Sequence, residues 1–281
     1  MKTPKRLESL IEDGLIDEVI RQMMSGKEAT IFVVRCGEET RCAKVYKEAN
    51  QRSFRQSTDY TENRKTKNSR QARAVEKGTR FGRKVQEQAW QSAEVDALYR
   101  LNAAGVRVPK PYNFHEGVLL MELIVDEQGH VAPRLHDLVF TREQAIAYHA
   151  MLLLQVVRML CSGVIHGDLS EYNILIGHDG PVIIDLPQAV DATGNNLAKQ
   201  LLERDVNNLK DYFGRFAPEL IQTNYGKEIW ALYAQGILHP EVTLTGHVDQ
   251  HLKQVDVGSI MREIDSAYQE ELAKRAYRSM K

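Results

Sequence analysis

The chain has 281 residues, and its 37 lysines and arginines nearly balance its 38 aspartates and glutamates, for a formal net charge of −1. This length is enough for one large domain or for two lobes around a real core, and a content of 43% hydrophobic and 27% charged residues excludes a globally disordered chain. The three cysteines form no C-x-x-C pair, and no apolar leader follows Met1. The apolar stretch at 145–160 is interrupted by polar residues. Together these features indicate a cytoplasmic protein with no membrane partner.

The first half of the chain is predicted to contain strands and one helix. Residues 31–34 are β-branched and aromatic, and 41–46 repeat a strand-like pattern after a turn at 37–39. A helix is expected over 86–102, because its apolar positions recur at helical spacing and a glycine follows. The apolar run 118–125 is typical of a buried strand.

A basic stretch separates the second of these strands from the helix. Residues 47–87 contain twelve basic and five acidic side chains, so the stretch carries +7 and the rest of the chain −8. It is poor in Leu, Ile and Val and can hardly bury enough apolar area to offset its ordering entropy. We predict a mobile or conditionally ordered insertion, and the near-neutral total therefore excludes no polyanionic partner.

The second half of the chain is predicted to be mostly helical. Thr141 and Gln144 form a capping-box signature ahead of a helix over 145–161. A small hairpin is expected over 173–184, and helices follow from about residue 195. Strands followed by helices favour an α+β chain. We place a β-rich N-lobe at 1–124 and a helical C-lobe, including a helical tail, at 125–281.

The strongest chemical signal is the run from His166 to Leu175, H-G-D-L-S-E-Y-N-I-L, followed by Asp185 at the end of an apolar segment. Phosphoryl transfer needs a carboxylate that orients the acceptor hydroxyl and oxygen ligands that hold Mg²⁺ against the phosphates. Asp168, Asn173 and Asp185 supply these groups at the kinase spacing H-x-D-L-x-x-x-N with a second aspartate downstream. The pattern predicts a phosphotransfer site.

A kinase also needs a strand lysine that contacts the nucleotide phosphates and a helix glutamate that holds this lysine. Lys44 lies in the second predicted strand, and Glu94 in the following helix is its best partner, with Glu87 two turns earlier as the alternative. The loop before the first strand, M-S-G-K-E-A-T, has a single glycine where a glycine-rich loop would cover the phosphates. Ser25 and Lys27 are therefore candidate phosphate contacts.

In combination, these motifs resemble the RIO family of atypical serine/threonine protein kinases over roughly residues 20–216. S-G-K-E-A at 25–29 is similar to the phosphate loop of that family, H-G-D-L-S-E-Y-N at 166–173 to its catalytic loop, and I-D at 184–185 and R-D-V-N-N-L at 204–209 also fit its pattern. The resemblance implies a bilobal protein-kinase-like fold with a β-rich N-lobe and a helical C-lobe. It also implies transfer of the ATP γ-phosphate to a Ser or Thr hydroxyl, including autophosphorylation.

The resemblance also implies a role for each candidate residue. The implied catalytic residues are Asp168, Lys44 and Glu94. ATP would be contacted by Ser25, Lys27, Lys44 and, at the hinge segment M-E-L-I, by backbone groups of Glu122 and Ile124. The metal ion, Mg²⁺ or alternatively Mn²⁺, would be bound by Asn173 and Asp185.

Three details narrow the resemblance. About 25 residues precede Gly26, so the chain is similar to the subfamily that lacks an N-terminal winged helix. Gly167 stands where typical kinases have an arginine that receives an activation-loop phosphate, so regulation by that route is not expected. The A-P-E sequence at 217–219 imitates a kinase motif, but we expect Pro218 to open a helix there.

The sequence does not identify the acceptor of the phosphate. The basic insertion could be a solvated loop without a partner, an RNA- or ribosome-facing segment, or an autophosphorylation region, since it contains seven serines and threonines. Relatives in the RIO family include ATPase switches of ribosome assembly that act through a phospho-Asp, which is one alternative. A small-molecule kinase of the aminoglycoside or choline type is another, although S-E-Y at 170–172 differs from the run usual in those enzymes.

Overall fold

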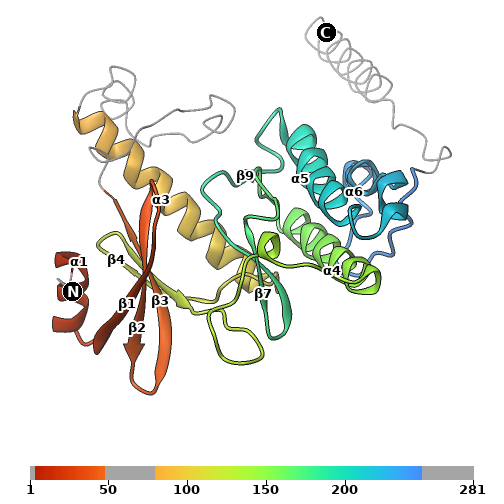
Figure 1. The fold of residues 1–281 in the computed structure, drawn as a ribbon. Coiled ribbons are helices and arrows are strands. Elements are labelled where there is room, and N and C mark those ends of the chain that lie inside the picture. The colour runs from red at the N-terminus through yellow and green to blue at the C-terminus, as the bar shows by residue number, and fades with distance from the viewer. Residues whose placement is uncertain (1–3, 48–79, 249–281) are drawn as a thin grey trace, which may run out of the picture.

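A five-stranded antiparallel sheet forms the N-lobe of the computed structural model, which describes residues 4–47 and 80–248 (Figure 1). The strand order is β1-β2-β3-β5-β4. The strands are β1 (Glu18–Ser25), β2 (Ala29–Cys36), β3 (Glu39–Tyr46), β4 (Pro111–His115) and β5 (Val118–Glu122). The predicted strands at 31–34, 41–46 and 118–125 fall in β2, β3 and β5, although β5 ends at Glu122 and the chain leaves the sheet there.

Two helices cover the two faces of this sheet because side chains alternate along each strand. On one face, α1 (Lys5–Glu12) buries Leu7 and Leu10 in a cluster with residues such as Phe32 and Leu120. On the other face, α3 (Arg80–Ala103) contributes Leu98 to the main core. Because α3 begins at residue 80, the last part of the predicted insertion is helical, whereas residues 48–79 lie outside the described residues.

The C-lobe is built mainly from helices, with two short antiparallel strand pairs at the side that faces the N-lobe (Figure 1). The helices are η3 (Leu135–Asp137), α4 (Arg142–Cys161), α5 (Ala198–Phe213), η4 (Pro218–Gln222) and α6 (Tyr225–Ala234). The strand pairs are β6 (Val164–Ile165) with β9 (Val190–Asp191) and β7 (Ile174–Gly177) with β8 (Gly180–Ile183). The predicted tail beyond residue 248 lies outside the described residues.

Local sequence determines where several of these elements begin. Thr141 caps α4 in a reciprocal capping box with Gln144, which confirms the predicted start of this helix. Pro218 lies in the first turn of η4, as expected for a helix start. In the described part of the chain, α4 is also the one helix with the length and hydropathy of a possible membrane span; half of that stretch is buried in the C-lobe.

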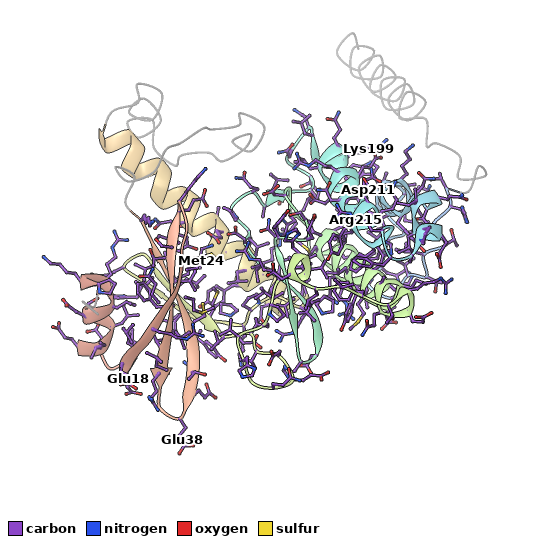
Figure 2. All side chains as sticks on the ribbon, viewed as in Figure 1. Glu18, Met24, Glu38, Lys199, Asp211 and Arg215 are labelled. Carbon is purple, nitrogen blue, oxygen red and sulfur yellow. The ribbon has the colours of Figure 1, made fainter. Side chains whose placement is uncertain are left out.

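The two lobes meet along the inner edge of the sheet. In the view of Figure 2, Met24 at the end of β1 lies toward the C-lobe, whereas Glu18 and Glu38 lie toward the opposite end of the sheet. Lys199, Asp211 and Arg215 lie in the upper part of the C-lobe in this view, on and just after α5. The end of β1 is thus one part of the N-lobe that approaches the second lobe, where Met24 contacts Arg134.

Candidate active site

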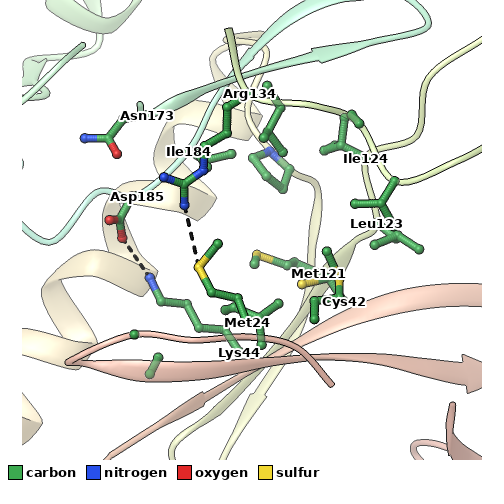
Figure 3. A pocket seen from close by; sticks show the side chains of 18 of the residues that line it. Met24, Cys42, Lys44, Met121, Leu123, Ile124, Arg134, Asn173, Ile184 and Asp185 are labelled. Carbon is green, nitrogen blue, oxygen red and sulfur yellow. Dashed lines mark hydrogen bonds and ion pairs between the residues drawn. The ribbon is translucent and has the colours of Figure 1, made fainter. Parts of the chain in front are cut away.

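A cavity of about 590 Å³ opens between the lobes, and residues from both lobes line it (Figure 3). Lys44 and Cys42 of β3 contribute from the N-lobe, and Asn173 and Asp185 from the C-lobe. The hinge segment 121–124 also lines the cavity, together with apolar side chains. Residues that are 141 positions apart in the sequence therefore face one space.

Lys44 lies at the centre of the charged wall. Its Nζ is 2.5 Å from Glu94 Oε1 and 3.0 Å from Asp185 Oδ1. Tyr46, two residues along the same strand, donates to Glu94 Oε2 at 2.8 Å. Glu94 has a side chain only 5% exposed, whereas that of Asp185 is 47% exposed toward the cavity. The predicted partner is thus Glu94, and Asp185 is the second anion of the triad.

The mutual charges of this triad decide its protonation. Desolvation alone would lower the pKa of Lys44, but the nearby carboxylates of Glu94 and Asp185 outweigh it and raise that pKa well above the ordinary value. Desolvation likewise opposes ionisation of Asp185, yet the charge of Lys44 and its hydrogen bond lower the pKa of this carboxyl. Near neutral pH the site therefore holds a charged ammonium beside a carboxylate that is open to the cavity.

Asn173 and Asp185 are oxygen-bearing side chains on the same side of the cavity (Figure 3). The Nδ2 of Asn173 donates to the Asp168 carbonyl at 2.9 Å, and within the described residues its Oδ1 has no hydrogen-bond donor. Asp185 adopts a left-handed φ of 65°, an uncommon conformation for a residue other than glycine, at the point where the strand pair ends. A carboxylate and an amide oxygen are the donors that a hard divalent cation prefers, so these residues fit such an ion.

Asp168 lies at the rim of this space. Its side chain is exposed and is not part of the cavity wall, and its N–H is 3.3 Å from His166 Nδ1. His166 is buried, and its Nε2 is 3.1 Å from the Ile184 carbonyl, which precedes Asp185. The loop that carries Asp168 is thereby tied to the segment that carries Asp185.

Side chains of helix α5 form hydrogen bonds with the loop that carries Asp168. This role was not predicted from the sequence. Asp205 accepts from the Gly167 N–H at 2.7 Å and from the Leu169 N–H at 3.0 Å, while Asn208 Nδ2 donates to the Leu169 carbonyl at 2.9 Å. Arg204 contributes a further hydrogen bond to the Gly167 carbonyl. The available signal was a charged residue on the apolar face of an amphipathic helix, at position 205.

Of the two candidate phosphate contacts, only one lines the cavity. Lys27 is part of its wall and is exposed. Ser25 is not: its Oγ is 3.3 Å from Thr30 Oγ1 and 3.1 Å from Lys47 Nζ. The loop between β1 and β2 is also shorter than the sequence pattern indicates, because the strands extend to Ser25 and begin again at Ala29.

The hinge residues Glu122 and Ile124 both line the cavity. The Glu122 carboxylate accepts two hydrogen bonds from the Arg107 guanidinium, at 2.8 and 3.0 Å, and one from the Lys110 N–H. Desolvation alone would raise the pKa of Glu122, but these contacts outweigh it and lower that pKa. The Ile124 carbonyl accepts from the Ala132 N–H at 3.0 Å. Within the described residues, the Ile124 N–H has no such partner and lies at the cavity wall.

Comparison with known proteins agrees with this arrangement. The family model of the RIO domain matches residues 30–225. The chain is 38% identical over 210 residues to the RIO-type serine/threonine-protein kinase Rio1 of Haloferax volcanii, an alignment that covers 73% of this chain and 67% of the relative. The corresponding protein of Methanocaldococcus jannaschii is 32% identical over 237 residues, with 81% and 76% covered.

The serine/threonine-protein kinase RIO1 of Chaetomium thermophilum is 29% identical over 222 residues, which cover 74% of this chain but only 41% of that longer protein. The RIO-domain match extends from β2 to the start of α6 and thus includes the strand lysine, the catalytic-loop segment and Asp185. A kinase uses ATP together with a divalent metal ion. The chain therefore belongs to the RIO family and is a RIO-type serine/threonine-protein kinase.

Proposed function

We propose that the cavity between the lobes binds the ATP of this kinase, and that its residues act as follows. Lys44, held by Glu94, contacts the nucleotide phosphates, as does Lys27. Asp168 at the rim accepts the proton of the acceptor hydroxyl. The observation that carries the proposal is the meeting of Lys44 with Glu94 and Asp185 in the wall of a cavity large enough for a nucleotide.

The adenine base belongs at the hinge in this proposal. The Ile124 N–H and the Glu122 carbonyl would pair with the base, while Cys42 and Met121 pack against its ring. Ser25 supports the phosphate end indirectly, because its hydroxyl contacts Lys47, and Lys47 Nζ in turn donates to the Gly26 carbonyl at 2.6 Å. These contacts fix the shape of the loop that would cover the phosphates.

Asn173 and Asp185 would bind the metal ion, which we propose to be Mg²⁺, with Mn²⁺ as the substitute. Among the described residues, no group of three or more metal-binding side chains occurs, so the protein alone offers an incomplete coordination sphere. Mg²⁺ is typically bound by one or two protein ligands together with substrate phosphates and water. When bound, the ion would neutralise charge on the phosphates.

We further propose that the acceptor is a Ser or Thr of a partner protein or of the basic stretch itself, and that RNA or a ribosomal particle is bound through that stretch. Its +7 charge, against −8 elsewhere, supports a polyanionic partner. The three free cysteines of the described structure support a reducing compartment, the cytoplasm.

The test is transfer of labelled phosphate from ATP by Asp168→Ala and Asp185→Ala variants. Each should lower transfer by about 10²–10⁴-fold, because each removes a group that acts on the reacting phosphate or hydroxyl. Asp179→Ala, at an exposed carboxylate in the β7–β8 turn, is the matched control and should retain activity. Full transfer by either site variant would contradict the assignment. Label that is stable to acid indicates a Ser or Thr acceptor, whereas label that hydroxylamine releases indicates an Asp acceptor.

A further inference from the structure

Arg134 projects into the cavity from the C-lobe, on the wall across from Lys44 (Figure 3). Its backbone is fixed on two sides. It pairs with Leu175 of β7, and its carbonyl accepts from the Asp137 N–H at 3.0 Å at the start of η3. The preceding Pro133 carbonyl accepts a further backbone hydrogen bond from β7 at 2.9 Å. The side chain therefore starts from a rigid point of the cavity wall.

The Arg134 guanidinium has five N–H donors but few acceptors. Within residues 4–47 and 80–248, its one hydrogen bond goes to the Sδ of Met24 on β1, at 3.6 Å. A thioether sulfur is a weak acceptor. No carboxylate in that part of the chain lies within ion-pair distance of Arg134. The nearby Asp185 pairs with Lys44, and the charge of Arg134 contributes to lowering the pKa of Asp185 from a greater distance. A guanidinium in this position is suited to an anion that enters the cavity.

The other cations of the cavity wall neutralise little of the negative charge of such an anion. Lys44 is already balanced by two carboxylates, Glu94 and Asp185. Lys27 is on an exposed loop that contains a single glycine, so fewer backbone N–H groups can approach phosphates than in a glycine-rich loop. Among the described residues of the wall, Arg134 is the remaining cation, and its planar fork matches two phosphate oxygens.

We propose that Arg134 donates directly to phosphate oxygens of the bound nucleotide, exchanging the sulfur of Met24 for an anionic acceptor. The inference rests on the nucleotide site proposed above and adds a phosphate contact from the C-lobe, opposite the one from β3. Because Met24 belongs to the N-lobe, the exchange also releases a contact between the lobes when the nucleotide enters.

The experiment measures the affinities of the full chain for ATP and for adenosine by calorimetry, each with Mg²⁺ and with EDTA. We expect Arg134→Gln to weaken ATP binding by about tenfold or more, the effect of losing a charge-assisted hydrogen bond, and to leave adenosine binding unchanged. The loss should persist in EDTA, because the contact is with the nucleotide and not with a metal ligand. Arg134→Lys keeps a cation without the fork and should give an intermediate ATP affinity.

Two control variants separate this contact from other effects. Arg35→Gln makes the same charge change at an exposed residue that pairs with Glu18, outside the cavity, and should not alter the ratio of ATP to adenosine affinity. Met24→Leu removes the sulfur acceptor but not the cation, and should also keep the wild-type ratio. If Met24→Leu lowered this ratio as Arg134→Gln does, the contact between the lobes would explain the effect and the proposal would be wrong.

The remaining outcomes would contradict either the phosphate contact or the nucleotide site. An equal loss of ATP and adenosine affinity in Arg134→Gln, or a loss of ATP affinity that vanishes in EDTA, would overturn the phosphate contact. Wild-type ATP affinity in Arg134→Gln would overturn it while leaving the nucleotide site intact. A wild-type protein that binds neither ligand would instead overturn the proposed nucleotide site itself.

Discussion

At the scale of single residues, Lys44 has two anionic partners with different environments. One is buried, and the other is open to the cavity. Glu94 is buried and also accepts from Tyr46, so it stays with the lysine whatever enters the cavity. Asp185 is half-exposed and can turn its oxygens to a ligand without leaving Lys44 uncompensated. The motif spacings in the sequence predicted that Lys44 pairs with Glu94 and that Asp185 belongs to the same site, but not the direct contact of Lys44 with Asp185. The hydroxyl partners of Ser25 were not predictable, because they depend on the loop geometry.

Asp205 provides a residue-scale prediction of pH dependence. Burial raises its pKa to about 6 from 3.8, although His166 and the N–H groups of Gly167 and Leu169 act in the opposite direction. Between about pH 4 and pH 6 the unfolded chain therefore loses this proton before the native protein does, and the contribution to stability falls as pH rises, by up to about 3 kcal/mol. Asp205→Asn removes this titration.

Urea unfolding at several pH values measures this effect. The free energy of unfolding of the native protein should fall relative to that of Asp205→Asn as the pH rises from 4 to 6, and the difference should be constant above that window. Asp211→Asn, at an exposed position of the same helix, is the control and should run parallel to the native protein. Parallel curves for Asp205→Asn as well would show that Asp205 does not titrate in this window.

At the scale of elements, the sequence predicted what depends on local pattern and missed what depends on packing. The strands β2 and β3, the capped helix α4 and the β7–β8 hairpin carry apolar β-prone runs, a cap or a turn, and these were predicted. The edge strand β1 was not, because it is mostly exposed and has two register shifts, so its residues show no clean alternation. Helix α1 is only eight residues long and is held by two buried leucines.

The cap of α4 gives the element-scale prediction. Thr141 accepts from the Gln144 N–H at 3.2 Å, and Gln144 accepts from the Thr141 N–H at 3.0 Å. Thr141→Ala should lower the free energy of unfolding by about 1 kcal/mol, because an N–H at the helix start loses its acceptor. Thr141→Ser retains the hydroxyl and should stay within a few tenths of the native value. Denaturant unfolding at fixed pH distinguishes them, and equal losses in both variants would exclude a role for the cap.

At the scale of the whole molecule, few side chains join the lobes across the cavity. Lys44 of β3 pairs with Asp185, and Met24 of β1 contacts Arg134. Both contacts lie where the nucleotide phosphates are proposed to bind, so a ligand there would replace or reinforce two of the contacts between the lobes. The sequence could predict two lobes from the order of strands and helices, but not this bridge, because position 134 is outside every motif and its importance comes from the wall that it faces.

The uneven charge of the chain gives the prediction at this largest scale. Changing Arg52, Arg55, Arg64, Lys65, Lys67 and Arg70 to Gln takes the basic stretch from +7 to +1 without shortening it. If the stretch binds RNA, the slope of log affinity against log salt should become shallower by about 0.7 for each phosphate that is no longer neutralised, because fewer counterions are released. ATP affinity should not change, since the described residues that line the cavity are left unaltered. A control that changes Gln51, Gln56, Asn63 and Asn68 to Ser keeps the charge and should keep the slope. Equal slopes in all three proteins, measured on single-stranded RNA, would exclude the basic stretch as an electrostatic contact with RNA. An autophosphorylation region and a solvated loop without a partner would then be the remaining interpretations.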